Sequence, residues 1–328
     1  MIVSIIMSLL LVAVFLLAVS WGSYTMSIGE VVSTLFGGGS KLQSTTIFDI
    51  RLPRICVAMV VAVCLSTSGC VLQSVTRNEL AEPGMIGINA GAALAVVLLI
   101  SSGQTTYYST IGDASLFVMP IVAIVGSLIS GLLIYRLSYK KGVSPTRLIL
   151  TGIGVNVGIN AFISLYQLNM AQGDYNQVLT WISGSLWGSS WKFFYLITPL
   201  ALIFLGLTIW KSKILDVLDL GDEIAIGLGV KVEQERKILF IYAITLAALA
   251  TSVAGNIAFL GLLGPQVAKR LVGPVHRRQI PMAAIVSCII VLFADSISRN
   301  VFSPIEIPVG ITIAIVGVPY FIYLMLKE

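Results

Sequence analysis

The chain has 328 residues, of which 57% are hydrophobic and only 11% are charged, and its formal net charge is +5. With a mean hydropathy of +0.98, this composition excludes a soluble globular domain, in which about a quarter of the residues are charged. Apolar runs long enough to cross about 30 Å of hydrocarbon recur along the chain. The sequence therefore predicts an all-α polytopic membrane protein that forms one transmembrane domain over residues 1–328.

The apolar runs predict about ten transmembrane helices. The first begins beside Met1 and lacks the basic residues that open a signal peptide, so we expect it to be kept as a span. The eighth is too short to cross alone, and we expect a re-entrant or buried helix there. The predicted spans cover residues 2–21, 54–76, 86–101, 117–138, 147–170, 192–210, 238–256, 259–268, 281–298 and 307–326.

The basic residues are divided unequally between the two sets of predicted loops. Placing both termini in the cytoplasm leaves only five of the 20 Lys and Arg residues outside: Lys41, Arg51, Arg54, Lys192 and Arg299. Such a bias sets the orientation of membrane proteins. It predicts a multi-pass membrane protein with both termini in the cytoplasm, and it accounts for the positive net charge without a nucleic-acid partner.

The segment 216–237, DVLDLGDEIAIGLGVKVEQERK, lies between the sixth and seventh predicted spans and resembles a piece of soluble protein. Asp219 or Gly221 can cap a short helix there, and Gly229 can end it in a left-handed conformation. Asp222 and Glu223 then fall in the first turn, where the helix dipole favours negative charge. The charge distribution places this helix in the cytoplasm.

This short helix needs a surface to pack on, because about two turns are not stable alone in water. The apolar residues Ile224, Ala225 and Leu228 offer a face for that contact. A docked helix between two spans predicts a contact surface for another protein.

Several chemistries have no motif in this chain. There is no GxxxxGK[ST] sequence, so the chain does not carry its own P-loop ATPase, and no HExxH or GxSxG arrangement suggests an enzyme. The four cysteines lie in apolar segments without a CxxC pair, which indicates packing rather than a metal or disulfide. The single histidine, His276, lies in a basic loop, where we expect it to be solvated or to face lipid headgroups. We predict no directly bound metal or cofactor.

Two pairs of polar residues within or beside the predicted spans could have a specific role. Asp295 and Arg299 are four residues apart, which allows an ion pair on one helix, and we favour that interpretation over a proton relay. Asn156 and Asn160 are one turn apart on the fifth span. They either lock two helices together or face a hydrated path.

Five segments carry a family resemblance. They are RLPR at 51–54; SGCVLQ at 68–73 with RNELAEPG at 77–84; LGDEIAIGLGV at 220–230; GNIAFLGLLGP at 255–265 with RLVG at 270–273; and EIPVGI at 306–311 with GVP at 317–319. Together they resemble the permeases of bacterial type II ABC importers for iron-siderophores, haem and cobalamin. Glu79 and Gln266 depart from the Pro and His that are usual in the family, which weakens any inference about the substrate.

The resemblance implies ten spans, with spans two to five and seven to ten related as two halves of inverted topology. It implies a second permease subunit, identical or related, with the path between the two chains. It also implies two ATPase subunits, which bind the ATP, and an extracytoplasmic siderophore-binding protein. Such an assembly lies in a bacterial cytoplasmic membrane and is surrounded by membrane lipid.

The resemblance also assigns residues. Arg51, Arg54 and Arg299 match outer arginines that pair with acidic groups of the binding protein, a task that suits the guanidinium fork; they could instead anchor lipid headgroups. Ser144, Pro145 and Thr146 lie where the inner gate is expected, although Pro145 could simply start a helix. Asn156 and Asn160 become candidates for the path. The segment that resembles the ATPase-coupling helix comprises Asp219, Leu220, Gly221, Asp222, Glu223, Ile224, Ala225, Ile226, Gly227, Leu228 and Gly229.

The predicted function is therefore that of a permease subunit, not an enzyme, which carries an iron(III)-siderophore complex into the cytoplasm with energy from ATP hydrolysed on a separate subunit. The same machine could carry haem or cobalamin. An alternative of a different class is a secondary transporter driven by an ion gradient, which would explain inverted halves but not the soluble-like segment.

Overall fold

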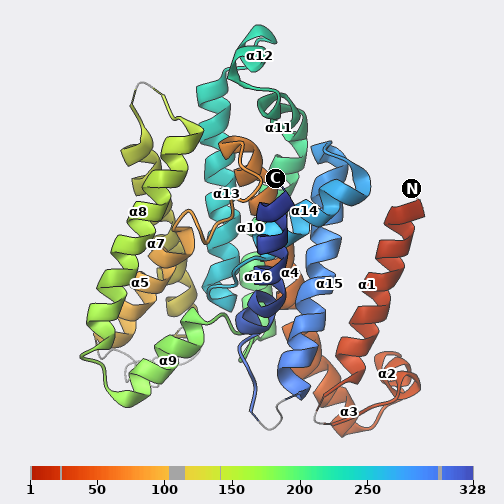
Figure 1. Ribbon diagram of the computed structural model, residues 1–328. Coiled ribbons are helices and arrows are strands. Elements are labelled where there is room, and N and C mark those ends of the chain that lie inside the picture. Colours follow the sequence, from red (N-terminus) through yellow and green to blue (C-terminus); the bar gives the residue numbers. More distant parts are fainter. Residues whose placement is uncertain (1, 23, 103–114, 141, 302–304, 328) are drawn as a thin grey trace.

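The computed structural model describes residues 2–22, 24–102, 115–140, 142–301 and 305–327, and this part of the chain is helical, with only an isolated bridge between Tyr139 and Val143. A helix lies on each of the ten predicted spans (Figure 1). These helices are α1 (Ile2–Ser20), α4 (Leu52–Thr76), α5 (Ile88–Ser101), α7 (Ser115–Ser138), α8 (Pro145–Gln167), α10 (Trp191–Trp210), α13 (Val232–Ala254), α14 (Leu260–Val272), α15 (His276–Asn300) and α16 (Val309–Lys327).

The predicted fold class is confirmed. Seven of the described helices are long and apolar enough to cross a membrane, and α5 and the apolar part of α16 are shorter. The eighth predicted span is α14, which has only 13 residues. The second span begins earlier than predicted, because α3 (Lys41–Thr45) and the π-helical turn η1 (Thr46–Arg51) continue into α4 as one helix of 36 residues.

Short helices mark the two ends of the bundle. α2 (Ile28–Leu35), α3 and α9 (Gln172–Ile182) lie at the lower end in Figure 1, and α11 (Ser212–Asp219) and α12 (Asp222–Gly227) lie at the upper end. Capping boxes start α2 and α3, in which Ser27 pairs with Glu30 and Ser40 pairs with Gln43. The start of α1 and the end of α16 both lie in the upper half, as an even number of spans requires.

The two halves run in opposite directions. α4 rises from the α3 end towards the α12 end, whereas α13 descends from the α12 end (Figure 1). After each of these helices comes a non-helical connection, at 77–87 before α5 and at 255–259 before α14. The two connections approach each other inside the bundle, where the side-chain amide of Asn89, in the first turn of α5, donates to Oδ1 of Asn256 in the second connection at 2.8 Å.

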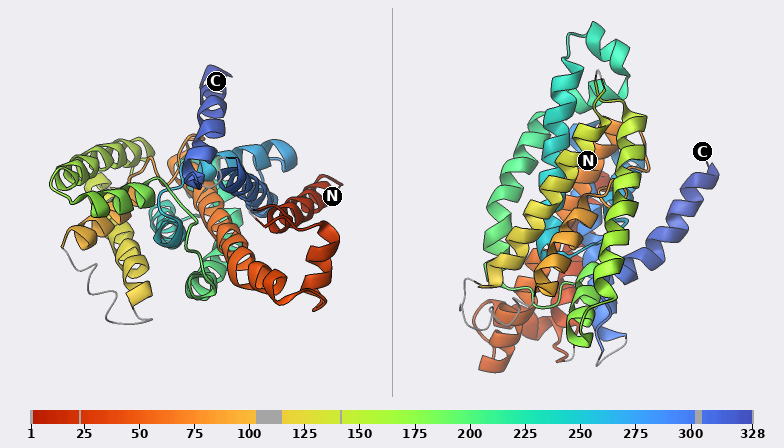
Figure 2. Two further views of the ribbon diagram at one scale, coloured as in Figure 1. Left: turned by 90° about the horizontal axis from the view of Figure 1, so that it is seen from below. Right: turned by 90° about the vertical axis from the view of Figure 1, so that its left-hand side faces the viewer.

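Burial separates inner helices from outer ones. In α4, 78% of the apolar stretch is buried, whereas the figure is 17% for α1, α8 and α10. The last of the ten helices, α16, leans away from the bundle in both views of Figure 2. The faces of α8 and α16 therefore have room for lipid or for another chain.

Gly69 allows the backbones of α4 and α14 to approach each other closely. A Cβ atom at this position would overlap the backbone carbonyl of Gly261 in α14. We therefore expect Gly69→Ala to lower the free energy of unfolding by about 2 kcal/mol, since neither backbone can move freely in a packed bundle. Gly206→Ala on α10 is the matched control, because nothing lies within 4 Å of its Cβ position. Thermal unfolding in detergent measures both, and equal melting temperatures would contradict the expectation.

Candidate functional site

The segment 216–237 folds as α11, α12 and the first turn of α13, and α12 projects from the upper end of the bundle (Figure 1). The predicted local structure is confirmed. Gly221 is the N-cap with a φ of +114°, Asp222 and Glu223 occupy the first turn, and Gly229 follows the helix with a φ of +83°. Both glycines adopt conformations that residues with a Cβ atom rarely adopt.

Ion pairs fasten α12 to the bundle. The Asp222 carboxylate pairs with Nη2 of Arg236 at 2.7 Å and also with Arg77, the residue that ends α4 in a left-handed conformation. Arg236 is only 2% exposed and also donates to the Val143 carbonyl at 2.9 Å. These bonds connect α12 directly to the end of α4 and to α13, and through Arg236 to the α7–α8 connection.

The predicted apolar face of α12 divides in two. Ala225 is fully buried, whereas Ile224 and Leu228 are more than half exposed, as are Leu220 and Ile226. Ala225 thus fixes the helix to its own chain, and the larger side chains point outward at a polar end of the molecule. An exposed apolar group of this kind marks a surface that another protein can cover.

His276 is not solvated, which corrects the expectation from the sequence. It is 2% exposed, and its ring joins two helices: Nδ1 lies 2.7 Å from Oδ1 of Asp216 in α11, and Nε2 lies 2.7 Å from Oγ of Ser74 in α4. Its backbone N–H also donates to Asp216 at 2.8 Å. The basic sequence around His276 pointed to solvent, and no local signal reveals partners 60 and 202 residues away.

At the lower end, the three predicted outer arginines gather around the first turns of α4 and the last turn of α15. Arg54 donates to Asp295 from Nη2 at 2.8 Å and to the more exposed Glu306 from Nη1 at 2.9 Å. Arg299 pairs with the same Asp295 at 3.1 Å, four residues away on α15, so the predicted ion pair is present. Asp295 is 1% exposed and holds both guanidinium groups in place.

Arg51 differs from the other two arginines. It is 4% exposed, and its guanidinium donates to the backbone carbonyls of Val19, Ser20 and Tyr24. These bonds tie the end of α1 to the start of α4, and they occupy guanidinium donors of Arg51 within its own chain. Arg54 and Arg299 are slightly more exposed, with 12% and 10% of the side chain accessible, and Arg299 also donates from Nη2 to the Ala18 carbonyl at 3.2 Å.

The candidate gate and path residues lie on α8 and just before it. Pro145 occupies the first turn of α8, as the alternative interpretation predicted, with Ser144 as N-cap and Thr146 exposed. Asn156 donates to the Gly84 carbonyl at 3.2 Å and so locks α8 to the 77–87 connection. Asn160 is exposed, and its side-chain amide donates to Oδ1 of Asn156 at 2.7 Å and to the Asn156 carbonyl at 2.8 Å. Asn156 thus links α8 to its neighbour, and a role of Asn160 in the path stays a prediction.

Glu82 is a buried carboxyl that the sequence analysis missed. It is 5% exposed in the 77–87 connection and accepts a hydrogen bond from the backbone N–H of Phe259, the N-cap of α14. Nearby, Thr251 donates to Asn89 at 3.0 Å. Burial raises the pKa of Glu82 to about 7. The residue lies in a loop in the sequence, and only the packing of that loop into the bundle removes it from water.

Replacing Glu82 by glutamine gives a pH-dependent prediction. Between its ordinary pKa of 4.5 and about 7, the folded protein keeps a proton that the unfolded chain has lost, so stability falls as the pH rises through this range. Glu82→Gln keeps the acceptor for Phe259 and removes this cost, up to ~3 kcal/mol. We expect a higher melting temperature for the variant at pH ~8 but not at pH ~4. An equal shift at both pH values would contradict this account.

Metal-binding geometry is not found in the described ranges, where no three His, Cys, Asp or Glu side chains come together. The four cysteines are free thiols.

Comparisons with known proteins agree with this geometry. The family model of the FecCD transport family matches residues 10–327. The chain is 45% identical over 324 residues to the iron(3+)-hydroxamate import system permease protein FhuG of Bacillus subtilis (strain 168), which covers 97% of this chain and 95% of that protein. It is 32% identical over 284 residues to the Fe(3+) dicitrate transport system permease protein FecD of Escherichia coli (strain K12), with 86% and 85% covered. A solved structure described as a metal-chelate type ABC transporter in an inward-facing conformation matches with a TM-score of 0.86 at 28% identity, over 98% of both chains.

Proposed function

Because the chain belongs to the FecCD transport family, we propose that it is the permease subunit of an ATP-driven importer that carries an iron(III)-siderophore complex into the cytoplasm. The observation that carries this proposal is α12, a short helix that the ion pairs of Asp222 fasten to the bundle and that carries exposed apolar side chains. A chain without a P-loop needs such a surface to receive energy from an ATPase.

The assembly that we propose places the α12 end in the cytoplasm, with both termini on that side. Two ATPase subunits bind the two permease chains at this cytoplasmic end, and each permease presents Asp219–Gly229 to one ATPase. ATPase closure moves α12, and the Asp222 ion pairs with Arg77 and Arg236 pass that movement to α4 and α13. Arg54 and Arg299 receive acidic groups of an extracytoplasmic binding protein at the opposite end.

The second permease covers the outer faces of α8 and α16. α8 exposes Asn160 and the glycines Gly154 and Gly158 among larger apolar residues, and α16 stands apart from the bundle (Figure 2). A siderophore complex is bulky and polar, so small and uncharged polar groups suit a wall of its path. Ser144, Pro145 and Thr146 close or open the cytoplasmic end of that path, and lipid covers the remaining outer faces.

Uptake measurements test the substrate. Both compared relatives are named for iron complexes, which favours a siderophore over haem or cobalamin. In a strain that lacks this chain, we expect uptake of iron from a ferric hydroxamate to fall to background and to return with the intact gene, while growth on haem and cobalamin is unchanged. Unaffected hydroxamate uptake with loss of haem or cobalamin use would support the alternative substrates instead.

One observation favours an ion-coupled transporter as a second candidate. Glu82 is a buried carboxyl with a pKa of about 7, the kind of group that proton-coupled carriers use. Its bond to the start of α14 gives it a structural role under the leading proposal. Uptake by Glu82→Gln separates the two: we expect it to stay dependent on ATP, whereas a carrier that uses this proton would lose uptake.

A further inference from the structure

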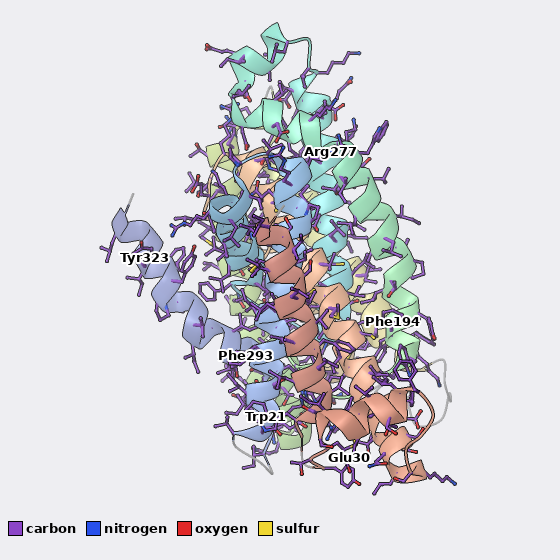
Figure 3. The ribbon with its side chains drawn as sticks, turned by 90° about the vertical axis from the view of Figure 1, so that its right-hand side faces the viewer. Trp21, Glu30, Phe194, Arg277, Phe293 and Tyr323 are labelled. Atoms are coloured by element: carbon purple, nitrogen blue, oxygen red, sulfur yellow. The ribbon has the colours of Figure 1, made fainter. Side chains whose placement is uncertain are left out.

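Two helices, α4 and α15, connect the outer arginine cluster to the α11–α12 segment. Each has 25 residues, which at 1.5 Å per residue gives about 37 Å, enough to cross the bilayer. They pack along their length, and residues from both belong to one apolar cluster. In Figure 3, α15 runs from Arg277 at the upper end past Phe293 towards the lower end.

Polar bonds fasten this helix pair near both ends. At the outer end, Arg54 of α4 donates to Asp295 of α15 from Nη2 at 2.8 Å and from Nε at 3.0 Å. At the inner end, Ser74 of α4 lies 2.7 Å from Nε2 of His276, the first residue of α15. Ser74, His276 and Asp295 are each at least 95% buried. Bonds held in such a dry environment fix the two helices in one register.

The inner fastening also includes α11, the helix that leads into α12. Asp216 of α11 accepts from the backbone N–H and from Nδ1 of His276. An ionised carboxylate can only accept, so Nδ1 carries a proton, while Nε2 accepts from the Ser74 hydroxyl in the neutral imidazole and donates to Ser74 Oγ in the imidazolium. The imidazole therefore uses one nitrogen for α11 and the other for α4, and a side chain with a single polar atom could not do both.

The α11 side of this joint has room to move. A cavity of about 270 Å³ lies beside His276, and Gln73, Ser74, Asp219 and Lys269 also line it. Nε2 of Gln73 is buried there without a hydrogen-bond partner among the described residues. On the other side of His276, α15 packs tightly against α4. The cavity therefore gives α11 space to shift, and the bonds of His276 to Asp216 and Ser74 would pass such a shift to the helix pair.

We infer that α4 and α15 form a strut that links binding-protein docking to the ATPase-facing segment, and that His276 is the positioning residue at its inner end. This inference rests on the proposed function, which supplies the partners at the two ends. It assigns to His276 a role in communication between the two ends, beyond holding α11 in place.

The test uses the complete complex of permease, ATPase and binding protein in nanodiscs, with a ferric hydroxamate as the probe. In wild type we expect the loaded binding protein to stimulate ATP hydrolysis. Ser74→Ala and His276→Ala should reduce this stimulation about fivefold or more, while hydrolysis without binding protein stays close to wild type. His276→Asn, whose amide can still donate to Asp216, should keep α11 in place but lose the bond to Ser74 and the stimulation.

Glu79→Gln is the matched control, because it also removes a partner of a charged pair at the inner end, with Lys269 at 2.5 Å, but does not join α4 to α15. We expect its stimulation to remain. A second readout uses the reciprocity of binding: in Ser74→Ala, the effect of nucleotide on binding-protein affinity and the effect of binding protein on nucleotide affinity should shrink by the same factor.

The outcomes separate this inference from the proposal it rests on. Wild-type stimulation in both Ser74→Ala and His276→Ala would overturn the strut and leave the importer intact. If His276→Ala does not assemble, Ser74→Ala decides, since it removes only one hydroxyl. A wild-type complex that assembles but neither transports nor responds to binding protein would instead contradict the proposed function.

Discussion

Replacing Ala225 by proline is expected to abolish ATP-driven uptake while the chain still inserts and binds its partner permease. Proline removes the hydrogen bond from the Ala225 N–H to the Gly221 carbonyl, 2.9 Å in this structure, and places a ring where the side chain is fully buried. Proline inside a helix costs about 3 kcal/mol, more than a helix of six residues can absorb. ATP hydrolysis and substrate uptake, measured on one preparation, should therefore become independent of each other.

Ala225→Gly is the control for this variant, because it keeps the N–H and adds no ring. Its effect should be limited to the roughly 1 kcal/mol by which glycine weakens a helix. The two ion pairs of Asp222 lie outside the substituted position, so α11 and the first turn of α13 should remain attached. Coupled uptake at the wild-type rate in Ala225→Pro would show that α12 does not transmit the energy.

Removing the charge of the outer arginines is expected to weaken binding-protein docking by about 10- to 100-fold at low salt. The variants are Arg299→Gln alone and Arg54→Gln combined with Asp295→Asn, so that no carboxylate is left buried without a cation. Part of the effect is long-range attraction, which salt screens over about 10 Å at 0.1 M. The affinity difference from wild type, measured by surface plasmon resonance, should therefore shrink as salt is raised.

Lys41→Gln on α3 is the control, because it removes a basic charge from the same end of the molecule but outside the cluster. Its effect should stay within about threefold. Docking by the arginine variants that matches wild type at low salt would remove the assignment. Arg51→Gln is expected to act differently: its donors hold backbone carbonyls at the end of α1, so it should lower the melting temperature more than the affinity.

Local signals in the sequence predicted the features that depend on neighbouring residues. Hydropathy located the ten helices that match the predicted spans, and glycines and first-turn acids located α12, because spans and caps are set by adjacent residues. The features that the sequence analysis missed depend on packing between residues far apart in the chain. Glu82 and His276 look like solvated loop residues until the 77–87 connection and the start of α15 fold into the bundle. The division of α12 between buried Ala225 and exposed Ile224 likewise depends on helices far away in the sequence.

The three arginines show what the family resemblance predicts beyond the local signals in the sequence. Their positions at 51, 54 and 299 gave no local reason to expect one cluster, and the family pattern supplied it. The spacing predicted the pair of Asp295 with Arg299, but neither the spacing nor the family pattern indicated that Arg51 is turned inward or that Asp295 also binds Arg54. Those details depend on where α1 ends and on how α15 faces α4, which a single sequence does not specify.

Transport in proteoliposomes tests the central claim most directly. The permease is reconstituted with its ATPase, and the binding protein is supplied with a ferric hydroxamate on one side of the membrane and ATP on the other. We predict iron accumulation that requires ATP and stops when the ATPase carries an inactive P-loop lysine. Accumulation that continues with the inactive ATPase, or that follows an imposed pH gradient without ATP, would contradict the claim that this chain is the permease of an ATP-driven importer.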